Sequence, residues 1–125
     1  MADRPPKDPL TEVRTRCLEL PEVTERASHG EPGWFIRGKK SFAMFALQHH
    51  DERIGVWLAA APGVQADLLA RSAQRFYVPP YVGTRGWIGL RLDVPGFDPA
   101  ELDELIVDAY LTVAPVPLRR LVADQ

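Results

Sequence analysis

Arginine and aromatic side chains alternate between residues 71 and 92, a segment with four arginines and no acidic residue. Because successive strand residues point to opposite faces, most of these side chains would share one face of a sheet. Guanidinium groups pair with phosphate and aromatic rings stack on bases, as on a nucleic-acid or anionic-ligand surface. Alternatively, the rings lie under a helix and the arginines pair with an acidic helix. The residues concerned are Arg75, Tyr77, Arg85, Trp87 and Arg91.

Two adjacent lysines, Lys39 and Lys40, lie at the tip of an expected β-hairpin. Lysines at such a tip can contact a phosphate backbone, although they also serve as ordinary solubilising residues. The leading hypothesis is a non-enzymatic DNA-binding module that contacts phosphate through the central basic segment. The contacts would come from Lys39, Lys40, Arg75, Arg85 and Arg91, with Tyr81 or Trp87 available for stacking.

The alternative hypothesis is a domain that binds a small anionic ligand or a protein partner. The segment Pro79–Gly86 is too rich in proline and glycine to form a strand, so it could cover a pocket. Ligand pockets combine an apolar lining with a few convergent polar groups. The side chains that could supply both are His29, Trp34, Tyr81 and Trp87.

Side chains suited to catalysis or metal binding are few. Cys17 is the single cysteine, and its helical spacing with Val13 predicts a small buried residue rather than a reactive thiol. His49 and His50 are adjacent at an expected hairpin tip, where strand geometry directs them to opposite faces. A solvated turn is their expected role, and a metal site is the alternative. No Gly-x-Ser-x-Gly motif for a nucleophilic serine occurs. We predict no catalytic residues, no metal and no cofactor.

The elements that must position these side chains follow from apolar periodicity and turn residues. Strands are expected at residues 34–37, 42–48 and 54–60, and their short connections require an antiparallel meander. Two further strands are expected at residues 75–78 and 87–92. The sheet should therefore contain about five strands.

Capping residues followed by proline predict where two helices begin. Asp8-Pro9 starts a helix that ends near residue 20, and Asp98-Pro99 starts one that runs to about residue 113. Shorter helices are expected after residue 62 and at residues 118–122. Helices packed on a mainly antiparallel sheet form a single α+β domain.

Length and charge set the limits of these hypotheses. A chain of 125 residues that is 46% hydrophobic forms one compact domain, expected at residues 10–125 after a flexible tail at residues 1–9. No apolar stretch approaches the roughly 20 residues that span a bilayer, and the N-terminus lacks a secretory signal, so a cytoplasmic location is expected. The net charge is −2, although residues 26–92 carry nine basic and four acidic residues.

Five short motifs occur in order along most of the chain: Cys17–Pro21, Ser28–Pro32, Trp34–Ala43, Pro79–Gly83 and Gly86–Leu90. Together they resemble the MmcQ/YjbR-like family over about residues 10–122. The resemblance implies a small α+β fold related to a double-wing arrangement and similar to the frataxin-type fold. Members are commonly labelled DNA-binding on the basis of fold analogy, and the family supplies no agreed catalytic set.

The frataxin-like analogy implies one further hypothesis, an iron or other metal partner. Such a partner needs a carboxylate-rich surface, and residues 93–108 contain six acidic residues. A solvated helix face explains the same residues. A nucleic-acid binder is usually basic, whereas this chain is mildly acidic. The placement of charge on the folded surface therefore decides between nucleic-acid binding and the alternatives.

Overall fold

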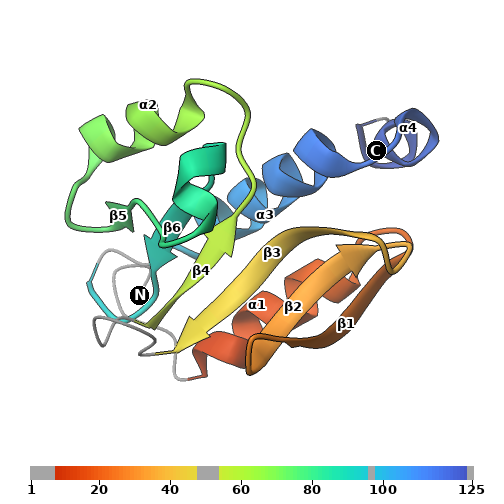
Figure 1. Cartoon of the computed structure of the whole chain (residues 1–125), viewed down its shortest axis with the longest axis horizontal. Coiled ribbons are helices and arrows are strands. Elements are labelled where there is room, and N and C mark those ends of the chain that lie inside the picture. The colour runs from red at the N-terminus through yellow and green to blue at the C-terminus, as the bar shows by residue number, and fades with distance from the viewer. Residues whose placement is uncertain (1–7, 48–53, 96–97, 124–125) are drawn as a thin grey trace.

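The structure is a computed structural model that describes residues 8–47, 54–95 and 98–123 (Figure 1). Four consecutive strands follow the first helix, and two helices follow one another at the C-terminal end of the described chain. In chain order the elements are α1 (Pro9–Leu18), β1 (Val23–Ser28), β2 (Glu31–Ile36), β3 (Lys40–Leu47), β4 (Ile54–Leu58), α2 (Val64–Arg71), β5 (Phe76–Tyr77), the 3₁₀ helix η1 (Val82–Arg85), β6 (Ile88–Arg91), α3 (Pro99–Val113) and α4 (Val116–Ala123).

Within the described ranges the strands form one antiparallel sheet of six strands in the order β1-β2-β3-β4-β6-β5. The predicted meander is confirmed, since β2, β3 and β4 pair in sequence. The predicted number of about five strands is corrected to six, because Val23–Ser28 pairs with β2 along its whole length. This edge strand contains Glu25 and Arg26 and is half exposed, so its sequence lacks a clear apolar alternation.

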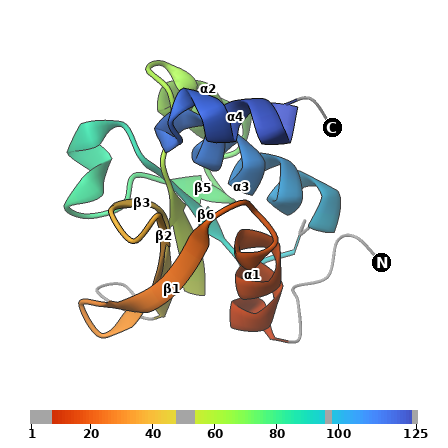
Figure 2. The same ribbon diagram turned by 90° about the vertical axis from the view of Figure 1, so that its right-hand side faces the viewer.

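The two faces of the sheet are covered differently. Helices α1 and α3 pack on one face, which we call the helix face (Figures 1 and 2). On the opposite side, which we call the open face, Figure 2 shows η1 projecting away from the long helices. Strand register places a row of neighbouring residues across the open face, one from each strand. From β1 to β5 this row is Arg26, Gly33, Met44, Trp57, Gly89 and Tyr77.

The helix face holds the largest fully buried aromatic residues. Trp34 is fully buried, and its indole Nε1 donates a hydrogen bond to Oε1 of Glu25 at 3.0 Å. Phe42 is an extra residue in β3 at the shift of register with β2, and its ring meets that of Tyr110 edge-on at a centroid distance of 5.5 Å. The Tyr110 hydroxyl donates to the carbonyl oxygen of Pro21 at 2.7 Å, which connects α3 to the turn after α1.

Both predicted helix starts are confirmed. Asp8 accepts a hydrogen bond from the backbone N–H of Thr11 at 3.2 Å, and Asp98 accepts one from the N–H of Ala100 at 2.9 Å. In each case proline follows the cap, where its missing N–H costs no helical hydrogen bond. No helix within the described residues combines the length and the apolar character needed to cross a membrane.

Candidate functional site

A cavity of about 620 Å³ opens on the open face, between the β1–β2 turn and the start of η1. Its lining is mainly apolar, and its polar side chains come from the β1–β2 turn and from the residue before η1. The described residues that line it are Ser28, His29, Glu31, Met44, Phe45, Ala46, Trp57, Tyr81 and Val82.

The β1–β2 turn forms one wall of the cavity. Ser28 pairs with Glu31 across a two-residue turn, in which His29 has φ +54° and Gly30 has φ +86°. Positive φ at both central residues defines a type I′ turn, in which Asn-Gly is the preferred sequence. Histidine is tolerated in the left-handed region less well than glycine, so the fold holds His29 at the cavity in an unfavourable backbone conformation.

Tyr81 forms the facing wall, also in an unfavourable conformation. Its φ and ψ are +66° and −63°, and the N–H of Val82 donates to the carbonyl oxygen of Pro80 at 2.7 Å. This geometry is a γ-turn with positive φ, which is rare and strained. The Tyr81 side chain is nevertheless 68% exposed, so burial of the ring does not explain the strain.

The segment that carries Tyr81 is anchored from α2. The amide nitrogen of Gln65 donates to the carbonyl oxygens of Gly83 at 2.9 Å and of Trp87 at 2.6 Å. Gly83 packs so closely on Val78 that an added Cβ would lie 2.5 Å from a methyl carbon of that valine. These contacts fix the position of η1 above the sheet.

The floor of the cavity is held by a contact that crosses three strands. The Trp57 indole Nε1 donates to the Tyr77 hydroxyl at 3.0 Å, and both side chains are buried. Tyr77 reaches Trp57 by lying over Gly89, where an added Cβ would come within 2.5 Å of the ring. Gly89 therefore allows Tyr77 to fix the orientation of Trp57 beneath the cavity.

Of the four residues predicted to line a pocket, the structure brings two together. His29 and Tyr81 both line the cavity. Trp34 instead lies on the helix face against Glu25. Trp87 is buried, and the Arg85 guanidinium carbon lies 5.4 Å from the centroid of the Trp87 ring. Neither tryptophan is among the lining residues.

Three residues that line the cavity were not predicted from the sequence: Met44, Trp57 and Glu31. Met44 and Trp57 lie in strands whose two alternating sets of residues are both apolar, so periodicity alone could not assign them to a cavity. Their pairing register across β3 and β4 supplies that assignment. Glu31 follows the His29-Gly30 turn directly, and recognition of a two-residue hairpin there would have placed it opposite Ser28.

The basic residues predicted to contact phosphate do not share one surface. Arg75 makes a two-pronged ion pair with Glu101 of α3, which is the alternative that the sequence left open. Glu101 also raises the pKa of Arg75 above its ordinary value. The Arg91 guanidinium lies 3.2 Å from the Asp93 carboxylate, so its charge is partly compensated.

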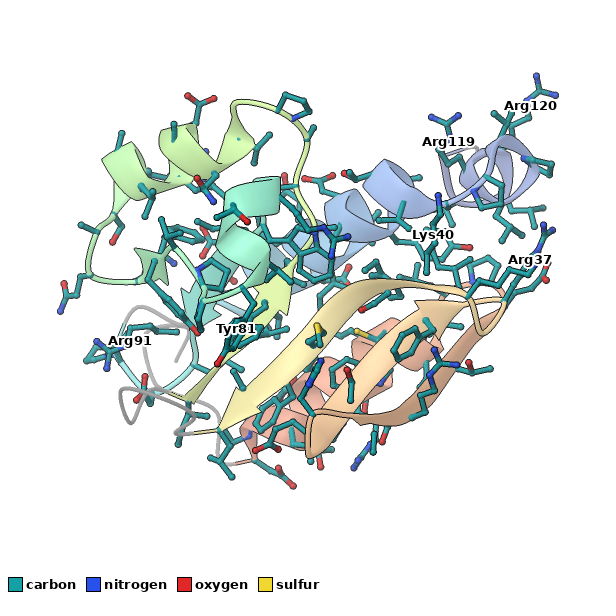
Figure 3. All side chains as sticks on the ribbon, viewed as in Figure 1. Arg37, Lys40, Tyr81, Arg91, Arg119 and Arg120 are labelled. Carbon is teal, nitrogen blue, oxygen red and sulfur yellow. The ribbon has the colours of Figure 1, made fainter. Side chains whose placement is uncertain are left out.

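The two lysines lie far from these arginines. Lys40 begins β3 and Lys39 lies in the turn before it, at the end of the molecule where α4 also lies. Figure 3 shows Lys40, Arg119 and Arg120 at that end and Arg91 at the opposite end.

The described residues offer neither an accessible thiol nor a cluster of metal ligands. Burial raises the pKa of the Cys17 thiol, which lies in the core. No three histidine, cysteine, aspartate or glutamate side chains in the described part of the chain form a set that could hold a metal ion. His49 and His50 lie outside the described residues.

Comparisons with known proteins agree with the fold. The family model for YjbR matches residues 18–112, which is more than half of the chain. The crystal structure of the Deinococcus radiodurans protein DR2400, with a DUF419 domain, matches with a TM-score of 0.71 at 17% sequence identity, covering 98% of this chain and 89% of that chain. A search of curated proteins gives no match. The chain, whose described residues form a six-stranded antiparallel sheet and four α-helices, belongs to the YjbR family.

Proposed function

We propose that this protein is a small-molecule-binding domain and that its site is the open-face cavity. The volume of about 620 Å³ lies within the range of ligand sites, roughly 300–1,000 Å³. Met44, Trp57 and Val82 offer an apolar surface, while Ser28, His29 and Glu31 offer hydrogen-bonding groups along one wall. This division suits an organic molecule with an apolar body and one polar end.

The observation that carries the proposal is the pairing of strained residues across the cavity. Among the described residues, four that are not glycine have positive φ, and two of these, His29 and Tyr81, form opposite walls. Such conformations cost about 1–3 kcal/mol each and concentrate at ligand sites. Asparagine or glycine would relieve part of this cost, so we infer that the imidazole and the phenol ring have a role that outweighs it.

Nuclear magnetic resonance titration with indole tests the proposal. The indole Nε1–H signals of Trp34, Trp57 and Trp87 form an internal comparison, since only Trp57 lines the cavity. We expect saturable shifts at Trp57, and much smaller shifts at the other two tryptophans. Tyr81→Ser should weaken binding about 10-fold, as expected for the loss of one aromatic contact.

A matched control is Leu121→Ser, since Leu121 is also exposed but lies on α4 outside the cavity. It should leave indole binding unchanged. The proposal is wrong if the Trp57 signal does not shift up to the solubility limit of indole, or if Tyr81→Ser and Leu121→Ser bind indole equally well.

We propose nucleic-acid binding as a second candidate, with a smaller set of residues than the sequence suggested. Lys39, Lys40, Arg119 and Arg120 have no carboxylate partner among the described residues. Lys40, Arg119 and Arg120 lie at one end of the molecule (Figure 3), and Lys39 directly precedes Lys40 in the chain. Arg75, Arg85 and Arg91 would contribute less, because each already contacts a carboxylate or an aromatic ring.

Salt dependence tests this second candidate. If the four side chains neutralise four phosphates of duplex DNA, a rise from 50 to 200 mM salt should weaken binding roughly 150-fold. Lys39→Gln with Lys40→Gln should reduce the slope of log affinity against log salt by about two. Binding that is absent at 50 mM salt and micromolar protein, or that does not respond to salt, contradicts this candidate.

A further inference from the structure

We infer that the open-face cavity selects ligands with an ammonium or similar cationic group attached to an aromatic or apolar body. This inference rests on the proposed function, and it adds the charge of the ligand. It follows from the charged and aromatic groups that surround the cavity.

The described residues that line the cavity carry a negative fixed charge. Glu31 is its only acidic lining residue among those described, and no described lining residue is lysine or arginine. Glu31 forms no ion pair with another described residue. A bound cation would give Glu31 a partner through a charge-assisted hydrogen bond, whereas a bound carboxylate would face a like charge.

Two described arginines of the open face, Arg26 and Arg91, are engaged elsewhere. The Arg26 guanidinium stacks at 3.9 Å from the Phe35 ring centroid and donates to the carbonyl oxygen of Gly38 at 3.0 Å. Arg91 is directed to Asp93. Neither side chain is among those that line the cavity, so neither offers an anion a partner there.

The aromatic residues that line the cavity also favour a cationic ligand group. Trp57 and Tyr81 both line the cavity, one at its floor and the other at its wall. The faces of indole and phenol rings attract cations within about 6 Å. A neutral ring in the ligand can pack on Met44 and Val82, while the cation lies between the aromatic rings and the Glu31 carboxylate.

Three probes of similar size separate charge from apolar contact: 2-phenylethylammonium, 2-phenylethanol and 3-phenylpropionate. Each is titrated at pH 7.5 and low salt, and the Trp57 Nε1–H signal reports binding. We expect the ammonium to bind about 10-fold more tightly than the alcohol, as one ion pair with a cation–π contact allows. The carboxylate should bind most weakly.

Two variants complete the test. Glu31→Gln keeps the shape of the side chain and should remove most of the preference for the ammonium. Glu104→Gln removes a carboxylate from α3, outside the cavity, and should leave the preference intact.

Equal binding of the three probes overturns the inference about charge but leaves the proposed function standing. A preference for the ammonium that survives in Glu31→Gln, or tighter binding of the carboxylate, also overturns it. Failure of all three probes and of indole to shift the Trp57 signal would instead contradict the proposed function itself.

Discussion

Substitution of Gly89 by alanine tests whether Tyr77 positions the floor of the cavity. The added methyl group would lie 2.5–2.7 Å from three carbons of the Tyr77 ring. Ordinary carbon contacts lie at about 3.5–4.0 Å, so the ring must move by about 1 Å. The hydrogen bond from Trp57 to Tyr77, now 3.0 Å long, would then break.

The expected loss of stability for Gly89→Ala is about 2–4 kcal/mol. Overpacking contributes about 1–3 kcal/mol, and loss of a buried hydrogen bond contributes roughly a further 1 kcal/mol. Urea denaturation followed by tryptophan fluorescence should show a midpoint lower by about 1–2 M. The Trp57 Nε1–H signal should also move, because it loses its acceptor.

A double-mutant cycle separates this explanation from a general intolerance of alanine in β6. In a Tyr77→Ala background the ring is gone, so Gly89→Ala should cost less than about 1 kcal/mol. Our reasoning is refuted if Gly89→Ala keeps the wild-type midpoint, or if its cost is the same in both backgrounds.

Three further predictions concern other parts of the fold. Because the Arg14 guanidinium holds the pKa of Glu25 below its ordinary value of 4.5, Glu25 stabilises the fold above that pH and loses this contribution as the pH falls through the lowered pKa. Glu25→Gln should therefore cost about 1 kcal/mol at pH 7 in urea titrations, with a smaller difference at pH 3. His29→Asn should raise stability by about 0.5 kcal/mol in thermal denaturation, since Asn-Gly suits a type I′ turn, while binding of indole weakens. Burial raises the pKa of the Cys17 thiol, so Ellman's reagent should modify it only after unfolding; rapid modification of the native protein would contradict its place in the core.

The helices and the meander could be predicted from the sequence because their signals are local. Asp98 and Pro99 mark the start of α3, and the structure places that helix at Pro99–Val113 as predicted. Short connections likewise determine antiparallel pairing without any knowledge of distant contacts. Strand β1 gave no such signal, because an exposed edge strand need not alternate apolar with polar residues.

The candidate site could be predicted only in part, because it depends on register and on partners distant in sequence. Alternation alone suggested that Arg75 and Tyr77 share a face, yet Arg75 turns to Glu101 on α3 while Tyr77 lies on the open face. Trp34 and Trp57 are both tryptophans in β-strands. Only the pairing of Trp34 with Glu25 and of Trp57 with Met44 assigns them to opposite faces.

The two walls of the cavity come from parts of the chain that are far apart in sequence: residues 28–46 and residues 81–82. The β1–β4 meander can form from neighbouring hairpins, whereas η1 must return to it after α2 and β5. A molecule in the cavity would contact both parts and would have to leave before they separate. At 100 times its dissociation constant it would raise the free energy of unfolding by about 2.7 kcal/mol. Binding in the cavity would thereby couple the docking of the later segment during folding to the concentration of a small molecule.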